Sequence, residues 1–394
     1  MLKLPCLSNL IFLWWLIIIG LSLSGATEIY QPTQFATLIV LCGISCMVIG
    51  SYLSLLAPIK IIRFRIMILT LSRIKWILIL IFLIGITPLY KATAFIFENG
   101  MDGFRSIAFS IDPETGESTV FGSLRYIFVV NNMIKPVAYA IFFHCIYLFF
   151  FENERRNLIL SFFVVFILSI STFGRFFLYH ILMVVLATFL LKISINNWVV
   201  GRKEMLKVFL LLSFFLVALV LFSFLRDVGN VFQSLIDYHV VGISIFSQEL
   251  SEQRSIINGS DINFTSLGFI ERLLVIGLNK FNLQMVSMVD YVETYLSAFR
   301  MVGRNTYYNA FSTWYFTLYL DGGIIYVLAY NLIYGFLLSY FERCFRVFKD
   351  AYSFMMTISL FFIAFFSVFT SIIQGPFILL PILSLLFACK FKKQ

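Results

Sequence analysis

Long apolar stretches, separated by shorter polar ones, run through most of this 394-residue chain. A helix needs about 20 mostly apolar residues to cross the hydrocarbon core of a bilayer. Stretches near this length predict ten transmembrane helices, at about 9–26, 35–57, 76–97, 126–151, 158–173, 176–191, 208–225, 323–341, 351–371 and 376–391. The expected fold class is therefore an all-α polytopic integral membrane protein with about 10 transmembrane helices.

The basic residues favour one side of the membrane. Most of the 29 Lys and Arg residues lie in alternate polar segments, namely 1–8, 58–75, 152–157, 192–207, 342–350 and 390–394. Because cytoplasmic loops are enriched in Lys and Arg, these segments are predicted to be cytoplasmic, with both termini inside. The chain then divides into an N-terminal transmembrane bundle of about seven spans (1–225, with an outer loop at 98–125), a large outer loop (226–322) and about three C-terminal spans (323–394).

The large outer loop is far longer than most connections within a domain. Apolar residues recur at helical spacing in 267–281 and again in 283–299. One stripe in the second stretch consists of Val286, Val289, Val292, Leu296 and Phe299. We expect two helices here that either lie on the membrane surface or pack against the outer end of the bundle.

Composition agrees with this pattern and narrows the function. The chain is 61% hydrophobic and 12% charged, and its mean hydropathy is +0.96, which excludes an ordinary soluble globular protein. The net charge of +9 is then a topology signal, so we expect no nucleic-acid partner. The sequence contains no nucleotide-binding or zinc motif, and the six cysteines predict neither a disulfide framework nor a metal site. We therefore expect no cofactor.

Arginine dominates the basic residues outside the cytoplasmic segments. Its planar guanidinium matches phosphate and carboxylate oxygens with two parallel hydrogen bonds, so an anionic ligand is expected at the outer face. Arg175 follows Gly174 at the outer end of the sixth span, where it either binds a ligand or anchors the helix end. Arg300 and Arg304 lie four residues apart, and in a helix they would share one face.

Further candidate chemistry lies in the large outer loop. His239 is the only histidine there and the natural general base near neutral pH, although a lone loop histidine is more often simply solvated. Amides and flat rings suit sugars, but they also suit the aromatic belt of a membrane protein. One such group consists of Asn305, Tyr307, Tyr308, Asn309 and Trp314. Asp321-Gly322-Gly323 is expected to cap and begin the eighth span.

Two motifs resemble the O-antigen polymerases of the Wzy type, inner-membrane enzymes of bacterial polysaccharide assembly. STFGRFFLYHILMVVL, residues 171–186, is similar to that family's Thr-Gly-(Ser/Gly)-Arg hairpin before a helix. VGRNTYYNAFSTWYFTLYLDGGIIYVLAYNLIYGF, residues 302–336, resembles its Gly-x-Asn-x-Tyr stretch followed by aromatic residues, Asp-x-Gly and the next span. The plan of ten to twelve spans with one large late periplasmic loop is also similar.

The resemblance implies a glycosyltransferase of the bacterial inner membrane whose active face is periplasmic. The growing glycan would move from undecaprenyl pyrophosphate to a new lipid-linked repeat unit, without a nucleotide sugar, because the pyrophosphate is itself the leaving group. The implied partners are the undecaprenyl-pyrophosphate-linked oligosaccharide, membrane lipid, a chain-length regulator and a flippase. The implied roles are catalytic for His239, Arg300 and Arg304, pyrophosphate-binding for Arg175, Arg254 and Arg272, and glycan-binding for Asn305, Tyr307, Tyr308, Asn309 and Trp314.

Two other functions stay open at this point. An O-antigen ligase would share the membrane plan and the lipid-linked donor but transfer the glycan to a lipid A core. A lipid-linked oligosaccharide flippase or other transporter is the non-enzymatic alternative. Transporters usually bury charged residues near the midplane and have short loops, whereas most outer charge in this chain lies in one long loop. The sequence therefore favours the enzyme.

Overall fold

The protein is mostly helical. The computed structural model describes residues 5–59, 71–107, 117–170, 176–195, 201, 205–206, 208–210, 212–213, 216–217, 220, 231–253, 255–257, 264–304, 306–308, 311–369 and 375–387. Six helices in the described part are long and apolar enough to cross a membrane: Cys6–Leu23, Gln34–Leu56, Ser72–Gly100, Leu124–Phe151, Leu178–Ile195 and Trp314–Phe348. This agrees with an all-α membrane protein, while the total of about ten spans and their directions stay predictions. The span expected at 208–225 lies largely outside the described residues.

The chain packs as two compact units that alternate along the sequence. Unit 1 comprises Met1–Ile62, Phe224–Lys349 and Ser359–Leu379, and unit 2 comprises Arg63–Ser223, Asp350–Ile358 and Leu380–Gln394. Unit 1 contains α1 (Cys6–Leu23), α2 (Gln34–Leu53), η1 (Ser54–Leu56), α9 (Val231–Ser251), η3 (Thr265–Leu267), α10 (Phe269–Asn279), α11 (Met288–Ser297), β1 (Arg300–Gly303), β2 (Thr306–Tyr308), α12 (Trp314–Phe348) and η4 (Pro376–Ile378). The helices α13 (Ala351–Phe366) and α14 (Leu379–Phe387) have residues in both units.

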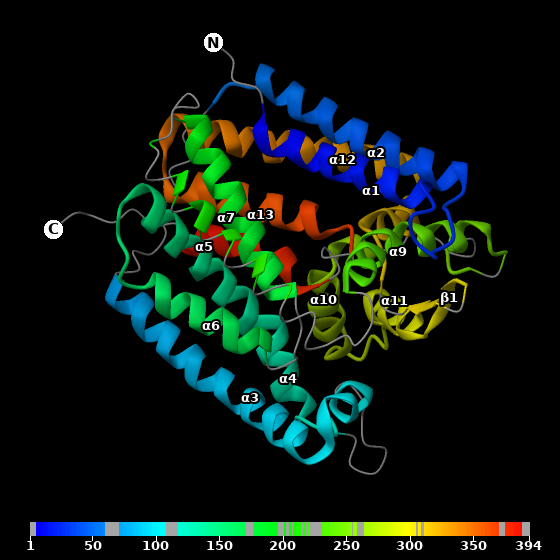
Figure 1. Cartoon of the computed structure of the whole chain (residues 1–394), viewed down its shortest axis with the longest axis horizontal. Helices are drawn as coiled ribbons and strands as arrows, with labels where there is room; N and C mark the ends of the chain where they lie inside the picture. The colour runs from blue at the N-terminus through cyan, green and yellow to red at the C-terminus, as the bar shows by residue number, and fades with distance from the viewer. Residues whose placement is uncertain are drawn as a thin grey trace. The chain divides into compact units, whose positions relative to one another are not determined.

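Unit 1 is built on two helices whose backbones touch. α2 and α12 run side by side (Figure 1). A Cβ atom on Gly50 would lie 1.9 Å from the carbonyl oxygen of Leu332, and one on Gly335 would lie 1.9 Å from that of Met47. The hydroxyl of Ser51 donates to the carbonyl oxygen of Gly335 at 3.1 Å. Small residues at these positions therefore permit the close helix contact, as they do in other membrane proteins.

A residue of α12 caps the first turn of α1. Pro5, the N-cap residue of α1, makes no capping hydrogen bond through its side chain. The carboxylate of Glu342, which has no exposed surface, accepts hydrogen bonds from the N–H groups of Cys6 at 2.8 Å and Leu7 at 3.2 Å. The same carboxylate pairs with Arg346. The buried carboxylate of Glu342 is thus satisfied by the N-terminus of α1 and by the Arg346 cation. These contacts fix α1 against α12.

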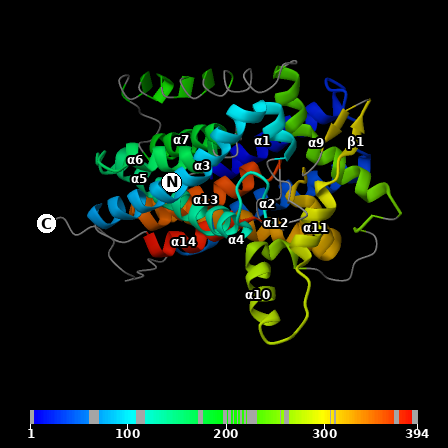
Figure 2. The ribbon, with the colours of Figure 1, turned by 90° about the horizontal axis from the view of Figure 1, so that it is seen from below.

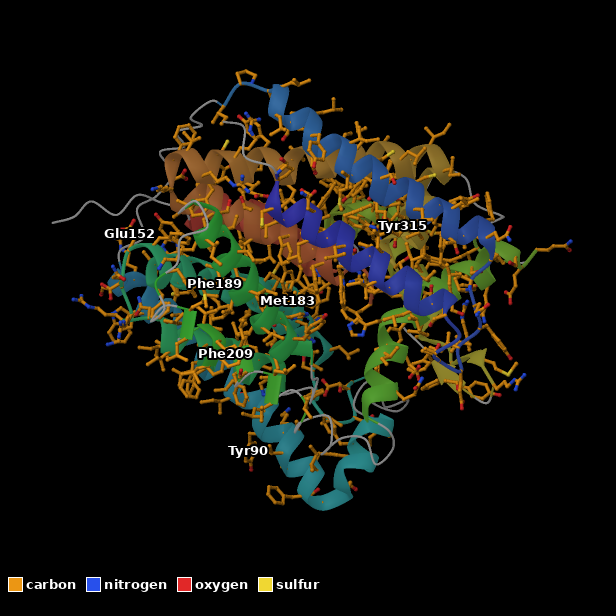
Figure 3. The ribbon with its side chains drawn as sticks, turned by 45° about the horizontal axis from the view of Figure 1, so that its top comes forward. Tyr90, Glu152, Met183, Phe189, Phe209 and Tyr315 are labelled. Carbon is orange, nitrogen blue, oxygen red and sulfur yellow. The ribbon has the colours of Figure 1, made fainter. Side chains whose placement is uncertain are left out.

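An aromatic core fills the space between the helices of unit 1. Tyr315 has no exposed surface, and its ring lies 4.9 Å from that of Trp15 in an edge-on contact (Figure 3). A Cβ atom on Gly43 of α2 would lie 2.4 Å from the Tyr315 ring. The first turn of α12 therefore packs into the body of the unit, between α1 and α2.

Unit 2 is a layered set of helices. It contains α3 (Leu71–Ile107), α4 (Leu124–Val129), the π-helical turn η2 (Val130–Ile134), α5 (Lys135–Phe151), α6 (Leu158–Ile170) and α7 (Phe176–Ile195). α6 packs against both α3 and α5, and α5 also packs against α7. Tyr90 of α3 points outward (Figure 3) and is 70% exposed. α3 continues past a break at Gly100, so part of the outer loop expected at 98–125 is helical.

The region expected as a large outer loop, 226–322, is largely helical where the structure describes it. α10 and α11 confirm the two helices that the apolar spacing predicts there. Along the predicted stripe of α11, Val289, Val292 and Leu296 are buried, whereas Val286 just before the helix is 81% exposed. The helical part of the stripe thus packs inside unit 1.

Candidate functional site

Four residues that the sequence singles out for chemistry lie in a β-hairpin of unit 1, namely Arg300, Arg304, Tyr307 and Tyr308. β1 pairs antiparallel with β2, with a register shift between Met301 and Gly303. The expected helix that would place Arg300 and Arg304 on one face is therefore wrong. Arg300 begins β1, and Arg304 lies in the turn that follows it.

The connection between α1 and α2 holds this hairpin in place. The N–H of Tyr30 donates to the carbonyl oxygen of Val302 at 2.7 Å, and the N–H of Arg304 donates to that of Glu28 at 3.3 Å. A Cβ atom on Gly303 would lie 2.3 Å from the Glu28 oxygen, so only glycine allows this approach. The backbone at Glu28 and Ile29 thus pairs with the end of β1.

Arg300 is held by a buried carboxylate of its own chain. Its guanidinium pairs with Glu249 of α9, which has no exposed surface. The same guanidinium lies 4.3 Å from the centre of the Tyr295 ring, and the Tyr295 hydroxyl donates to both Glu249 oxygens at 3.1 and 3.0 Å. The hydroxyl of Ser255 donates to Glu249 as well. With these contacts Arg300 is better suited to fix the hairpin against α9 and α11 than to bind a pyrophosphate directly.

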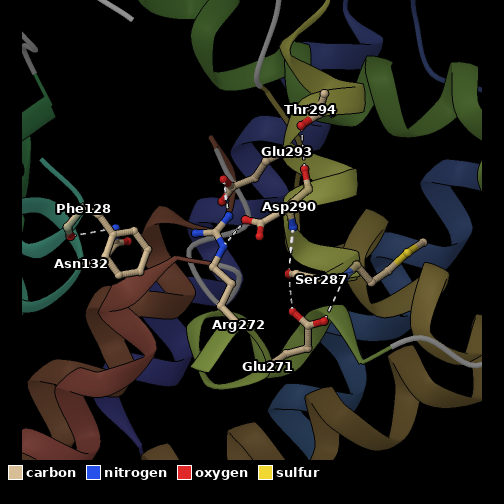
Figure 4. A network of polar contacts seen from close by, with 9 residues as sticks. Phe128, Asn132, Glu271, Arg272, Ser287, Asp290, Glu293 and Thr294 are labelled. Carbon is tan, nitrogen blue, oxygen red and sulfur yellow. Dashed lines mark hydrogen bonds and ion pairs between the residues drawn. The ribbon is translucent and has the colours of Figure 1, made fainter. Parts of the chain in front are cut away.

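Arg272 is also neutralised within the unit. Its side chain is 9% exposed and pairs with Asp290, at 2.5 Å, and with Glu293 of α11 (Figure 4). Burial alone would lower the pKa of Arg272, but the two carboxylates outweigh burial and raise it. Two anions already surround the cation, so its contacts leave no positive charge for a further anion. These contacts favour a structural role for Arg272, and the expected pyrophosphate-binding role stays a prediction.

A second polar pair joins the same two helices. The carboxylate of Glu271 accepts hydrogen bonds from the hydroxyl of Ser287 at 2.7 Å and from the N–H of Met288 at 2.9 Å (Figure 4). Ser287 in turn caps α11, because its hydroxyl accepts a hydrogen bond from the N–H of Asp290. The charged residues of α10 near its start are therefore turned inward, toward α11.

Arg304 differs from the other two arginines. It is exposed at the hairpin turn, and within the described part of the chain its guanidinium makes no ion pair or hydrogen bond. Only its backbone is fixed, through Glu28. Among the described arginines of the expected site, it is the one whose charge remains available to an anion. Arg175, Arg254, Asn305 and Asn309 lie outside the described residues.

Aromatic rings adjoin the hairpin. Tyr238 of α9, Tyr308 of β2 and Phe311 form a group, called here the aromatic trio, with ring centres 5.0 to 5.6 Å apart. Tyr307, beside the trio in β2, is 57% exposed. Exposed and half-buried rings of this kind fit the apolar faces of sugars.

Trp314 belongs to the core and not to this surface. It has no exposed area, and its ring lies 5.2 Å from that of Tyr334 and 6.1 Å from that of Tyr330. Its burial favours a role in packing, and the expected glycan contact of Trp314 stays a prediction. The reason for the burial is that α12 begins at Trp314, well before the expected start of the eighth span.

His239 and Asp237 lie on α9, on different sides of the helix. The ring of His239 is half-buried between those of Trp14, at 5.1 Å, and Phe369, at 4.5 Å. Asp237 is 7% exposed and accepts a hydrogen bond from the Gln233 amide at 2.9 Å. Residues two apart on a helix do not face each other, so the two cannot act as a hydrogen-bonded pair.

Asp237 was not singled out by the sequence, but its environment makes it a candidate. Burial raises its pKa, and the hydrogen bond from Gln233 opposes this shift, while the nearby carboxylate of Glu28 adds to it. Glu28 also accepts a hydrogen bond from the N–H of Arg304 through its backbone carbonyl oxygen. A carboxyl with a raised pKa is a suitable proton acceptor.

Asp321 caps a different element from the one expected. Its buried carboxylate accepts hydrogen bonds from the N–H groups of Thr265 at 2.8 Å and Ser266 at 2.6 Å, at the start of η3. α12 is already helical before this point and is broken at Gly322 and Gly323. The turn expected at this triplet is therefore present as a break between two helical segments, whereas the Asp321 carboxylate caps η3 and anchors the segment before α10.

Comparison of this chain with protein-family models, with curated proteins and with solved structures finds no match. Within the described residues, no group of three or more His, Cys, Asp or Glu side chains is placed to hold a metal ion. The argument for function therefore rests on the side chains around the hairpin and on the resemblance of the sequence motifs.

Proposed function

We propose that this protein is a membrane glycosyltransferase that extends a polysaccharide. It transfers the growing glycan from undecaprenyl pyrophosphate to a new lipid-linked repeat unit. The observation that carries the proposal is the exposed guanidinium of Arg304, at the turn of a hairpin whose strand β2 contributes Tyr308 to the aromatic trio. Asp237 directly precedes Tyr238 of the same trio. An available cation, sugar-binding rings and a proton acceptor are the groups that such a transfer needs.

In the proposed reaction, a hydroxyl oxygen of the acceptor sugar forms a bond to the anomeric carbon of the donor. The bond from that carbon to the pyrophosphate oxygen breaks, and the pyrophosphate leaves with the electron pair. Arg304 stabilises the charge that develops on the leaving group, together with Arg175 and Arg254 as the motif resemblance implies. Asp237 or His239 accepts the hydroxyl proton, and the environment of Asp237 supports it as the first choice.

Arg300 and Arg272 take supporting roles in this proposal. The pair of Arg300 with Glu249 fixes β1, and the pairs of Arg272 fix α10 to α11, so both act on the site through its shape. Tyr307 and Tyr308 offer ring faces to the glycan, together with Asn305 and Asn309. The proposed reaction uses no cofactor, because cleavage of the bond between the sugar and the lipid pyrophosphate supplies the free energy for the transfer.

The proposal places the protein in the bacterial inner membrane with about ten spans and both termini in the cytoplasm. The hairpin and α9–α11 would then lie at the periplasmic face, where lipid-linked repeat units are polymerised in the family that the motifs resemble. A chain-length regulator and a flippase are its proposed partners. The distribution of Lys and Arg supports this orientation.

The test is reconstitution of the purified protein in liposomes with a synthetic undecaprenyl-pyrophosphate repeat unit and no nucleotide. A ladder of lengthened glycans is expected. If glycan is consumed only after lipid A core is added, the protein is a ligase. If lipid-linked oligosaccharide is moved across the bilayer without any new glycosidic bond, the protein is a transporter, and the proposed role of Arg304 is wrong.

A further inference from the structure

On α10 charged side chains are buried and apolar side chains are exposed, which is the opposite of a helix that faces water. Its charged residues Glu271 and Arg272 are buried, while Leu273, Leu274 and Leu278 are 38%, 55% and 36% exposed. The apolar surface continues past the end of the helix, into the loop that leads to α11. We define the α10 apolar face as Leu273, Leu274, Leu278, Phe281, Met285 and Val286.

This face protrudes from unit 1. Figure 2 shows α10 and its following loop extending away from α11 and α12. Phe281 and Val286, near the end of the loop, are 78% and 81% exposed. A contiguous apolar surface on a protruding element is a site of contact with lipid or with another protein.

The charges of α10 need no water. Arg272 is neutralised by Asp290 and Glu293, and Glu271 accepts hydrogen bonds from Ser287 and Met288. The two helices are thus locked together by charges that turn away from the α10 apolar face. Charges that are paired within the protein cost less to bring near a medium of low dielectric constant than unpaired charges do.

Part of the backbone of the loop after α10 is satisfied in the same way. The amide of Asn279 donates to the carbonyl oxygen of Met285 at 2.9 Å and accepts from its N–H at 2.7 Å. The N–H groups of Lys280, Phe281 and Asn282 donate to carbonyl oxygens of the preceding turn. These bonds satisfy part of the loop backbone, which lowers the cost of placing that part at the boundary of a bilayer.

We propose that the α10 apolar face inserts into the outer boundary of the lipid bilayer. The same chain has six helices that are long and apolar enough to cross a membrane, so a bilayer lies beside it. Lys280, exposed at the end of α10, is then at the level of the anionic headgroups, with Phe281 below it in the acyl region. The membrane-spanning helices of the same chain favour lipid over a protein partner at this face.

The test uses the full-length protein in liposomes that contain a phosphatidylcholine with a diazirine in its acyl chain. After irradiation and digestion, mass spectrometry locates the lipid adducts. Adducts are expected in 273–286 at a yield similar to that of the exposed face of α1, which includes Leu13 and Ile17. Met301 in β1 is 50% exposed and serves as the internal comparison, where few adducts are expected.

A pair of variants sharpens the result. The double variant Leu274→Asn/Leu278→Asn should reduce the yield of adducts in 273–286 several-fold. The control variant Met301→Asn should leave that yield unchanged. A yield in 273–286 no higher than at Met301 in the unaltered protein would overturn the proposal. So would a yield in 273–286 that the two Asn substitutions leave unchanged. Neither outcome depends on glycosyltransferase activity, so this proposal and the proposed function can fail separately.

Discussion

The guanidinium of Arg300 pairs with the carboxylate of Glu249, which has no exposed surface, and this pair ties the hairpin to α9. Arg300→Ala would leave that carboxylate buried and without its cation. Breaking such a pair costs about 3–5 kcal/mol. We expect a clear loss in the free energy of unfolding, measured by denaturation in detergent. Arg300→Lys keeps the charge and should lose less, and equal losses for both variants would show that the charge itself does not matter.

The contact between α2 and α12 predicts that replacing glycine by alanine has opposite effects on stability at two positions, one inside this contact and one outside it. Gly335→Ala places a methyl group against the carbonyl oxygen of Met47, 1.9 Å away before any shift, so the helices must separate. We expect destabilisation of roughly 4 kcal/mol or more and a low yield of folded protein. Gly20→Ala in α1 is the control, because nothing lies within 4 Å of its added Cβ atom, and it should stabilise by about 0.5–1 kcal/mol. Similar yields for both variants would contradict the close packing described.

Arg304 should matter for activity and not for stability. It is exposed, and its guanidinium is the proposed contact of the leaving pyrophosphate. Arg304→Ala is expected to lower the polymerisation rate roughly 100-fold, as the loss of one charge-stabilising donor does in other enzymes, with an unchanged unfolding midpoint. Arg304→Lys should recover part of the rate. Arg156→Ala removes an arginine whose side chain is 80% exposed and should leave the rate unaltered. A normal rate for Arg304→Ala would remove this residue from the mechanism.

Asp237 predicts how stability depends on pH. Because burial raises its pKa above the ordinary 3.8, the folded state favours the protonated form. Its contribution to stability is therefore complete below about pH 4 and is lost as the pH rises through the raised pKa. The side chain introduced by Asp237→Asn cannot ionise. The unfolding temperature of the variant minus that of the unaltered protein should therefore increase as the pH is raised from about 4 to about 8. Glu252→Gln, at an exposed position, is the control; a constant difference for Asp237→Asn would contradict the assignment.

Much of the helical plan could be predicted because a membrane span requires only length and apolarity. The stretches 35–57 and 126–151 coincide with long helices for this reason. α10 and α11 were predicted as well, because their apolar side chains recur every three or four residues, and such a pattern can be seen in the sequence alone. What lies between such segments depends on contacts that no local pattern contains.

The hairpin illustrates what could not be predicted. Its strands are only four and three residues long, too short for an alternating pattern to be recognised. The pairing of Arg272 with Asp290 joins residues 18 apart, and that of Arg300 with Glu249 joins different elements. Spacing along the chain shows that arginines are present but not which carboxylates neutralise them. Arg304 is therefore distinguished from its neighbours only by the folded structure.

The most direct test of the central claim is the stoichiometry of the leaving group. Undecaprenyl pyrophosphate released and glycosidic bonds formed would be counted together, in liposomes that contain only the purified protein and the lipid-linked repeat unit. The account predicts one molecule released for each bond, without any nucleotide, and a parallel fall of both in Arg304→Ala. New bonds without released undecaprenyl pyrophosphate, or bonds formed only when a nucleotide sugar is added, would contradict it.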